Sequence, residues 1–523
     1  MENLESPDTG FYNLTAGEFI ASLLQVQLLL QTQRELTTAS PDSLSTLAHE
    51  RIHFLQALFT GNGQMAWRAH RDYNEALSHY WLVSGRDIDG KLTIPWSLHD
   101  GMSEIQRRQA KLQFKVCSDL LRIELYRQVK SAIPIQMKGP EVALVLNPFL
   151  RNPTIEFEGN SYDFPGICVF EGHAMFGEES YLQASMVDAT DFWNRNLHPT
   201  EYWLAYEWYL TKCGHERRHL FPVICELALQ GSWDFRDDYL YEKEWQESSP
   251  AWRFVRLTEV LASSPDLKMG TYECWPVEYV TFTKKLLHKC GYKDLDTVIV
   301  ERATATTIRG KLTPMEELMV RGLRYKAAKP WCAANPAIDQ ILWKSLEEDF
   351  PLPSVIVEGD FWPSNPPRGN ITTECVNEMH FQALIRQLRG SLSPEARKDS
   401  LVECGFRTFK VWDYCPHQRD GTCKGCFDPV VGPPVPFTVK PDGTTTGCTY
   451  EEMLLTLELK CSDLKVDSKA SMPGVPDEFY NPQPVAKISF ARRFFRALSV
   501  GVRVGVHAFR SNGNKKKLQD SND

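Results

Sequence analysis

Apolar residues recur at helical spacing, every third or fourth position, through most of the first 235 residues. Capping signals mark where two of these helices should begin. Thr15 to Glu18 forms a capping box before an apolar run, and Asp42 or Ser43 can cap the next run. The pattern predicts helices over 18–36, 44–59, 64–84, 103–131, 169–195 and 201–230.

A short alternating segment at 154–164, TIEFEGNSYDF, predicts a small hairpin that turns at Gly159–Asn160. Helical spacing continues after it, and from residue 401 short strands and Gly/Pro turns take over. We therefore expect a mainly α fold, with a multi-helix metal-binding domain, a second helical region and a small Cys-rich α+β segment. The expected parts are a helical metal-binding domain at 1–235, a second helical region at 236–400, the Cys-rich segment at 401–485, and a basic helix with a disordered tail at 486–523.

The composition is that of an ordinary globular protein. The 523 residues are 42% apolar and 24% charged, which is enough to build a large core. Lys and Arg number 58 and Asp and Glu 67, so the formal charge is 58 − 67 = −9, which does not favour nucleic-acid binding. No signal-peptide pattern is visible, and no apolar run reaches the roughly 18 residues that span a bilayer. These features predict a cytoplasmic protein.

The segment LAHERIHFLQ at 47–56 contains an HExxH motif, His49-Glu50-Arg51-Ile52-His53. On a helix, residues i and i+4 share a face, so His49 and His53 can converge on one metal ion. Glu50, one position round the helix, can then act as a general base on a water bound to that ion. The alternative is a pair of histidines with a purely structural role.

A catalytic zinc needs a third protein ligand, and Glu171 is the best candidate. It begins a predicted helix directly after the hairpin, in the segment EGHAMFGE at 171–178. Together, HExxHxxQ at 49–56 and EGxAxxxE at 171–178 resemble the gluzincin class of zinc metallopeptidases. The resemblance implies that His49, His53 and Glu171 hold zinc and that Glu50 is the base.

A second HExxH, His215-Glu216-Arg217-Arg218-His219, allows a different interpretation. Ferritin-like di-iron proteins take an ExxH pair from each of two helices and one glutamate from each of two more. The segments ExxH at 50–53 and ERRH at 216–219 resemble those pairs, which implies two iron ions. Glu50, His53, Glu216 and His219 would be ligands, with Glu178 or Glu179.

Antiparallel packing across the turn NLHPTE would support part of that set. Residues equidistant from the turn then lie at one level, which matches Glu178 or Glu179 with 216–219 and Glu171 with Glu226. Glu226 could thus orient a ligand histidine, or join Glu50, His53 and Glu171 in an all-helical site.

Two features near the C-terminus have weaker signals. Cys404, Cys415, Cys423 and Cys426 include one CxxC pair, the spacing of a zinc knuckle, although four free thiols are the alternative. Residues 488–510 mix Arg and Phe and could make weak contact with a membrane or a partner, although a solvated helix packed by its Phe face explains them as well.

These patterns favour a zinc-dependent, peptidase-like hydrolase that acts on a peptide or small-molecule substrate. A ferritin-like di-iron oxygenase or oxidase is the second hypothesis. A non-enzymatic interaction protein with structural histidines is the third.

Overall fold

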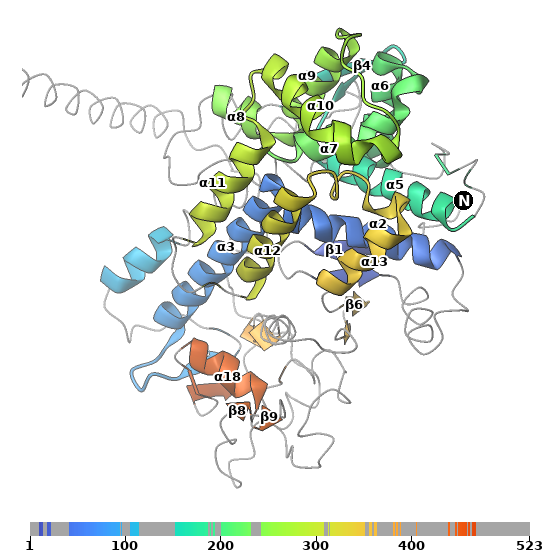
Figure 1. Ribbon diagram of the computed structural model, residues 1–523. Helices are drawn as coiled ribbons and strands as arrows, with labels where there is room; N and C mark the ends of the chain where they lie inside the picture. The colour runs from blue at the N-terminus through green and yellow to red at the C-terminus, as the bar shows by residue number, and fades with distance from the viewer. Residues whose placement is uncertain are drawn as a thin grey trace, which may run out of the picture. The chain divides into compact units, whose positions relative to one another are not determined.

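A computed structural model describes most of the predicted helical part of the chain (Figure 1). The described residues are 10–13, 18–21, 41–94, 96, 105–113, 152–186, 189, 192–193, 200–231, 242–307, 312, 314–350, 355–357, 360–362, 380–381, 383–384, 387–388, 404, 438–439, 445–446, 448–457, 459–460 and 463–466. All of them belong to one compact unit that comprises Met1–Lys138 and Phe149–Pro473.

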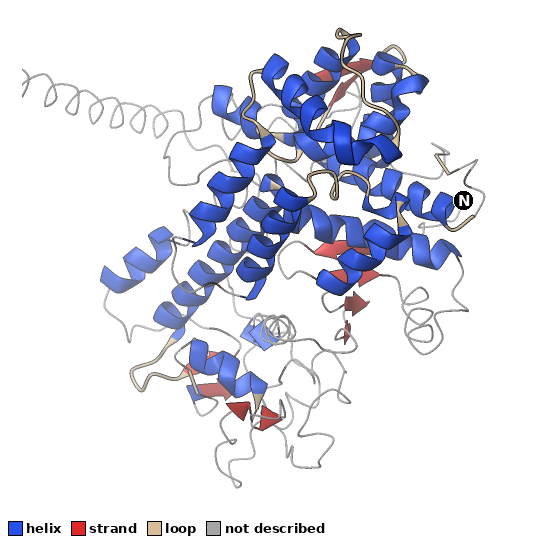
Figure 2. Cartoon of the chain, viewed as in Figure 1, coloured by secondary structure: helices blue, strands red, loops and turns tan. Residues whose placement is uncertain are grey.

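The fold is mainly α, as the sequence predicts, and helices dominate the described residues (Figure 2). The α-helices are α2 (Pro41–Phe59), α3 (Gly61–Gly85), α5 (Ile167–Ala184), α6 (Thr200–Cys213), α7 (Phe221–Ala228), α8 (Glu242–Ser248), α9 (Pro250–Ala262), α10 (Trp275–Cys290), α11 (Leu295–Thr307), α12 (Pro314–Ala328), α13 (Gln340–Asp349) and α18 (Thr449–Thr456). The 3-10 helices are η3 (His215–Leu220), η4 (Tyr272–Cys274) and η5 (Pro336–Ile338). No described helix combines the length and the apolar character needed to cross a membrane.

The strands are short and form four small sheets. Strands β1 (Gly10–Asn13), β2 (Glu18–Ala21), β6 (Val355–Val357) and β7 (Asp360–Trp362) form one sheet in the order β1-β2-β6-β7. The others are the pairs β3 (Leu92–Ile94) with β10 (Leu464–Val466), β4 (Thr154–Phe157) with β5 (Asn160–Asp163), and β8 (Thr438–Val439) with β9 (Thr445–Thr446).

The helix predicted from Glu18 is wrong where the structure describes it, because Glu18–Ala21 is strand β2. Phe19 pairs with Tyr12 in the antiparallel partner β1 and with Val355 in the parallel partner β6. Pairing with a distant strand overrides the local capping box and helical spacing. The rest of that prediction, 22–36, lies outside the described residues.

The predicted hairpin is present, but its turn lies one residue earlier than expected. Phe157 pairs with Asn160, which leaves Glu158 and Gly159 as the two turn residues. Both have positive φ, 49° and 77°, as a two-residue type I′ turn requires. This hairpin leads directly into α5.

Two predicted helices end earlier than their apolar pattern does. The helix predicted at 169–195 ends at Ala184, and Met186 beyond it has a φ of 60°. The helix predicted at 201–230 stops at Cys213, because Gly214 has a φ of 82°, and a 3-10 turn and α7 follow. Of the helix predicted at 103–131, residues 105–113 are described and helical.

The contacts between α5 and α6 show that the two helices run in the same direction. Cys168 lies near Glu201, Gly172 packs against Ala205, and the Phe176 ring lies 6.0 Å from the Tyr206 ring. These partner numbers rise together, whereas in an antiparallel pair one would fall. The expected antiparallel packing of one continuous helix 201–230 against α5 is therefore wrong, although Arg218 does pair with Glu179, so the expected match of Glu179 with 216–219 is found.

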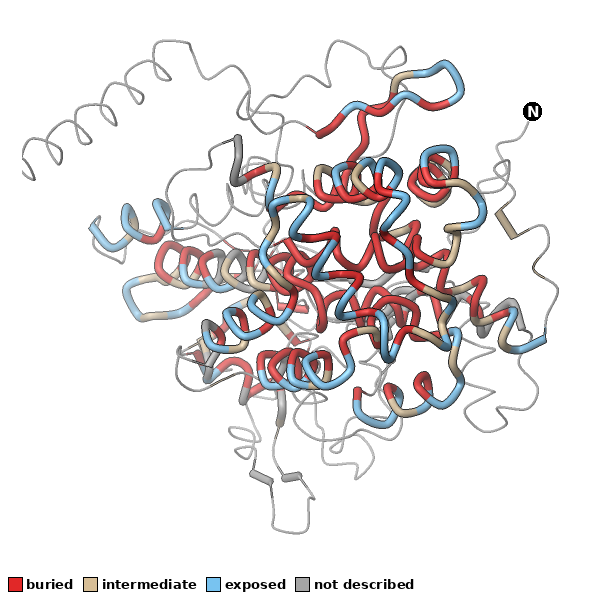
Figure 3. The backbone as a smooth tube through the Cα atoms, turned by 45° about the horizontal axis from the view of Figure 1, so that its top comes forward, coloured by how far each residue is buried: buried red, intermediate tan, exposed pale blue. Residues whose placement is uncertain are grey.

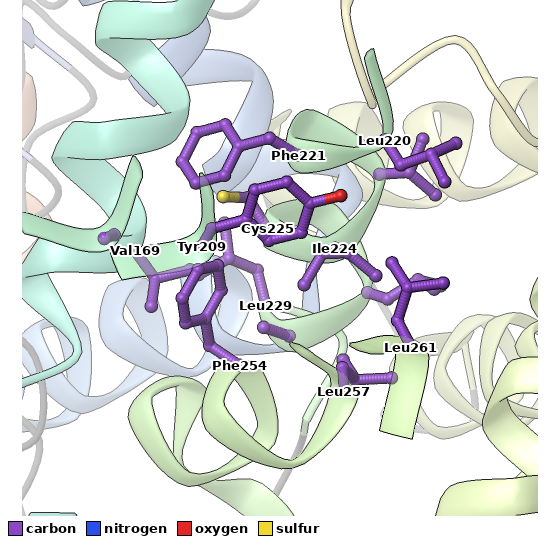
Figure 4. Close-up of a cluster of buried hydrophobic side chains, with 14 of the residues drawn as sticks. Val169, Tyr209, Leu220, Phe221, Ile224, Cys225, Leu229, Phe254, Leu257 and Leu261 are labelled. Carbon is purple, nitrogen blue, oxygen red and sulfur yellow. The ribbon is translucent and has the colours of Figure 1, made fainter. Parts of the chain in front are cut away.

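The main hydrophobic core joins α5, α6, α7, α9 and α10. Phe221 and Ile224 of α7 are fully buried at its centre, with Phe254 and Leu257 of α9 beside them (Figure 4). The same cluster includes Ile155 and Leu295, so it extends on both sides of residue 235, where a boundary was expected.

Helix α2 lies among other helices and is buried along most of its length. Phe54, Leu58 and Phe59 pack against α12 and α13, and Ala48 and Ile52 pack against Ala174 of α5. Buried positions run through the middle of the described unit, and exposed ones lie on the outer faces of its helices (Figure 3). The ligand candidates on α2 are therefore held by packing on both sides.

Candidate metal centre

Helices α2 and α5 pack together and bring three metal-binding side chains into one cluster. His49 and His53 lie one turn apart on α2, and Glu171 faces them from α5. Gly177 of α5 leaves room for the Ile52 side chain of α2, since a Cβ there would lie 1.9 Å from Ile52 Cδ1.

The three ligating atoms form a nearly equilateral triangle. His49 Nε2 lies 3.1 Å from Glu171 Oε2, and His53 Nε2 lies 3.2 Å from the same oxygen. The two Nε2 atoms are 3.1 Å apart. Among the described residues this is the one group of three histidine, cysteine or acidic side chains close enough to hold a metal ion.

His49 has a second carboxylate on its outer side. Its Nδ1 lies 3.2 Å from Glu178 Oε2, in a close ion pair rather than a well-aligned hydrogen bond. Ser45 Oγ donates a 2.8 Å hydrogen bond to the other oxygen of Glu178. Glu178 was predicted as a possible di-iron ligand, and the structure places it behind His49.

His53 has an amide on its outer side. Its Nδ1 lies 2.8 Å from Gln56 Oε1, and Gln56 Nε2 donates to the carbonyl of Phe170 at 3.1 Å. Gln56 Nε2 also lies 3.1 Å from His173 Nδ1, and His173 Nε2 lies 2.6 Å from the carbonyl of Ala334. No role was predicted for Gln56 or His173, although Gln56 is the last residue of HExxHxxQ and His173 lies within 171–178.

The charges of the cluster depend on one another. Burial lowers the pKa of His49, but Glu171 and Glu178 outweigh burial and hold that pKa well above its usual value. Burial raises the pKa of Glu171, but His53 and His49 lower it further and leave it well below its usual value. Without a metal, these shifts favour a proton on the His49 imidazole beside an ionised Glu171 carboxylate. A divalent cation could replace that proton.

The first turn of α6 lies next to the cluster and was not predicted to do so. The Tyr202 ring lies 5.8 Å from the His49 ring, and burial together with the charge of Glu171 raises the pKa of the half-buried Glu201. No sequence signal marked these residues, because the parallel course of α6 brings them there. Glu50 belongs to α2, but its side chain lies outside the described residues.

The second HExxH motif, residues 215–219, contacts other parts of the fold and is not part of the histidine cluster. It forms η3 rather than an α-helix, and its His215 and Glu216 are exposed. Arg218 pairs with Glu179, and His219 Nε2 lies 2.9 Å from the carbonyl of Met269. An η3 turn does not place residues i and i+4 on one face as an α-helix does.

Glu226, the remaining acid of the alternative sets, is fully buried in α7 but pairs with Lys326 of α12. Tyr279 and Gln230 donate further hydrogen bonds to its carboxylate. The charge of Glu226 acts on His173, two residues after Glu171. Glu226 thus has a complete set of partners away from the histidine cluster.

Most of the candidate residues near the C-terminus lie outside the residues that the structure describes. Cys404 is buried, and Cys415, Cys423 and Cys426 lie outside the described residues, as does the basic stretch 488–510.

Comparison with known proteins adds no family. No protein-family model, curated protein or solved structure matches this chain. Function is therefore inferred from the site itself.

Proposed function

We propose that the protein is a zinc-dependent hydrolase in which His49, His53 and Glu171 hold the metal. The observation that carries the proposal is the size of the triangle formed by the three ligating atoms, whose edges are 3.1, 3.1 and 3.2 Å. Zinc binds histidine nitrogen and carboxylate oxygen at about 2.0–2.2 Å. The edge of a tetrahedron is ~1.63 times the bond length, which gives about 3.3–3.6 Å. The side chains would need to move by only a few tenths of an ångström.

The chemistry follows from the donor set. Two imidazoles and one carboxylate leave the fourth position of a tetrahedral zinc open, as in catalytic rather than structural sites. When bound, zinc would act as a Lewis acid and lower the pKa of a water at that position to about 7. Glu50 would accept the proton of that water on its carboxylate as the water attacks an amide or ester carbonyl.

The class of substrate is a peptide or a small molecule with such a carbonyl, in line with the resemblance of the two motifs to gluzincin peptidases. A cytoplasmic location, without a nucleic-acid partner, is part of the same proposal. The donor set of two histidines and one carboxylate is also that of mononuclear iron(II) oxygenases. Metal analysis therefore comes first.

The first experiment is metal analysis of the purified full-length chain. We expect one zinc bound per His49–His53–Glu171 cluster, and His49→Ala should lose it while the matched His219→Ala retains it. About two iron ions per chain would favour the di-iron alternative, and one iron lost with His49→Ala would favour a mononuclear oxygenase. A chain without metal whose stability is unchanged by added zinc would favour the non-enzymatic hypothesis.

The second experiment separates binding from catalysis. Glu50→Gln should keep zinc and lose hydrolysis of a casein, peptide and ester panel by at least ~100-fold, the usual contribution of general base catalysis. Full hydrolysis by Glu50→Gln would contradict the role of Glu50, whereas lost zinc would make Glu50 a ligand.

A further inference from the structure

The outer partners of the two ligand histidines determine which ring nitrogen carries hydrogen. A neutral imidazole has one N–H donor and one acceptor nitrogen, and only the acceptor nitrogen can bind a metal. In this cluster both inward-facing atoms are Nε2. Zinc therefore requires the hydrogen of each ring to be on Nδ1.

For His53, the nitrogen that carries hydrogen is fixed by a series of contacts that begins at the Ala334 carbonyl. A carbonyl oxygen can only accept, so the 2.6 Å contact with Ala334 requires hydrogen on His173 Nε2. The buried His173 ring contacts this carbonyl and an amide rather than a carboxylate, which favours its neutral form and leaves Nδ1 as an acceptor. Gln56 Nε2 therefore donates to His173 Nδ1.

The carbonyl of Phe170 fixes the same orientation of the Gln56 amide, because it too accepts from Nε2. The opposite orientation would place Gln56 Oε1 against that carbonyl oxygen and leave two buried acceptors without hydrogen. Gln56 Oε1 must then face His53 Nδ1, at 2.8 Å, and accept its hydrogen. The His53 Nε2 lone pair is left pointing into the cluster.

For His49, the Glu178 carboxylate favours the same tautomer, with hydrogen on Nδ1. Glu178 Oε2 lies 3.2 Å from His49 Nδ1, and Ser45 Oγ donates to the second oxygen of Glu178. The carboxylate is thus held as an acceptor and favours hydrogen on Nδ1. The two rings reach the same tautomer through different chemistry, one with a neutral amide and one with an anion.

We propose that Gln56 and Glu178 are positioning residues for the metal, and that His173 acts one step further out by fixing the Gln56 amide. The inference rests on the proposed zinc site. It adds that the segment around Ala334, which follows α12, helps to set the protonation of a ligand on α2. Outer partners of ligand histidines usually contribute roughly 10- to 100-fold to metal affinity.

The test measures the zinc dissociation constant of the full-length protein by competition with a chromophoric chelator. Gln56→Leu and Glu178→Ala should each weaken zinc binding about 10- to 100-fold. Glu178→Gln should recover most of that loss, because an amide oxygen can also accept from Nδ1. His173→Phe should cost less than Gln56→Leu, since Phe170 still holds the amide.

Gln64→Leu is the matched control. Gln64 is a buried glutamine whose Nε2 donates at 2.8 Å to the carbonyl of Leu58, away from the cluster. The Gln64→Leu variant should be less stable than wild type but bind zinc equally tightly, which separates a positioning role from a general effect on folding. In zinc-loaded wild type with ¹⁵N-labelled histidine, NMR should show metal-bound Nε2 and protonated Nδ1 for two rings.

The failures are distinguishable. Wild type that binds no zinc would overturn the proposed function and this inference with it. If wild type binds zinc but Gln56→Leu and Glu178→Ala bind as tightly as Gln64→Leu, only the inference is overturned. Metal-bound Nδ1 in the NMR spectrum would overturn it as well, even if a variant failed to fold.

Discussion

The buried ion pair between Glu226 and Lys326 offers the sharpest test of how the core is held. Both side chains are fully buried, and Lys326 Nζ also donates at 3.3 Å to the carbonyl of Phe59, the last residue of α2. The lysine therefore neutralises a buried carboxylate and also satisfies the C-terminal end of the helix that carries His49 and His53.

Removing one partner of such a pair leaves the other charge buried and unpaired, which costs about 3–5 kcal/mol. Lys326→Met should thus raise the unfolding constant roughly a hundred- to several-thousand-fold, at about 1.4 kcal/mol per factor of ten. Glu226→Gln should cost a similar amount. The double variant has no unpaired charge, so it should cost less than the sum of the two by roughly 2 kcal/mol.

The assay is urea unfolding of the full chain, followed by tryptophan fluorescence with a chelator present so that metal binding does not contribute. Lys293→Met is the matched control, since Lys293 pairs with Glu301 at 2.9 Å but the two side chains are 66% and 54% exposed. An exposed pair contributes at most about 1 kcal/mol. If Lys326→Met shifted the unfolding midpoint no more than Lys293→Met, the reasoning from burial would be refuted.

Three further predictions concern pH, packing and the second motif. Burial lowers the pKa of His173 to about 4. As the pH falls, this residue is therefore protonated in the unfolded chain before it is protonated in the folded chain. Stability of the zinc-free protein should fall from about pH 6.5 to about pH 4 by up to ~1.4 kcal/mol per unit from this group. Urea titrations of His173→Phe should show a shallower slope, and an unchanged slope would contradict the assignment. Gly63→Ala would place a Cβ 2.5 Å from the backbone of Ala57. It should cost about 1–3 kcal/mol in thermal or urea unfolding, and wild-type stability would show that the turn between α2 and α3 can relax. The double variant His215→Ala/His219→Ala should keep its zinc in metal analysis, because η3 lies apart from the cluster, and lost zinc would contradict that placement.

The sequence predicted those parts of the site that depend on local spacing. An HExxH on a capped helix puts His49 and His53 on one face, and the helix after the hairpin carries Glu171. The structure brings these three side chains together. The helices that carry them, α2 and α5, were also predicted, because their apolar periodicity extends over several turns.

The features that were missed depend on contacts between distant segments. Strand β2 pairs with β6, so Phe19 meets Val355, and no signal near Phe19 could indicate that partner. Glycine is unfavourable inside a helix, but the φ of 82° at Gly214 and the 3-10 turn after it depend on tertiary packing. Periodicity shows that a segment is helical, but it does not show which element lies beside it.

The same distinction explains why the outer partners of the histidines were missed. Gln56 lies three residues after His53 and could have been examined as its neighbour, but its amide orientation is fixed by Phe170 and Ala334. The parallel course of α5 and α6 likewise decides that Tyr202, rather than a residue near Glu226, lies beside His49. The three candidate ligands thus follow from local spacing on α2 and α5, whereas the proposed protonation of each histidine depends on residues that only the fold brings within reach. A search for such sites in other chains should therefore take the ligands from sequence spacing and the tautomers from the packed structure.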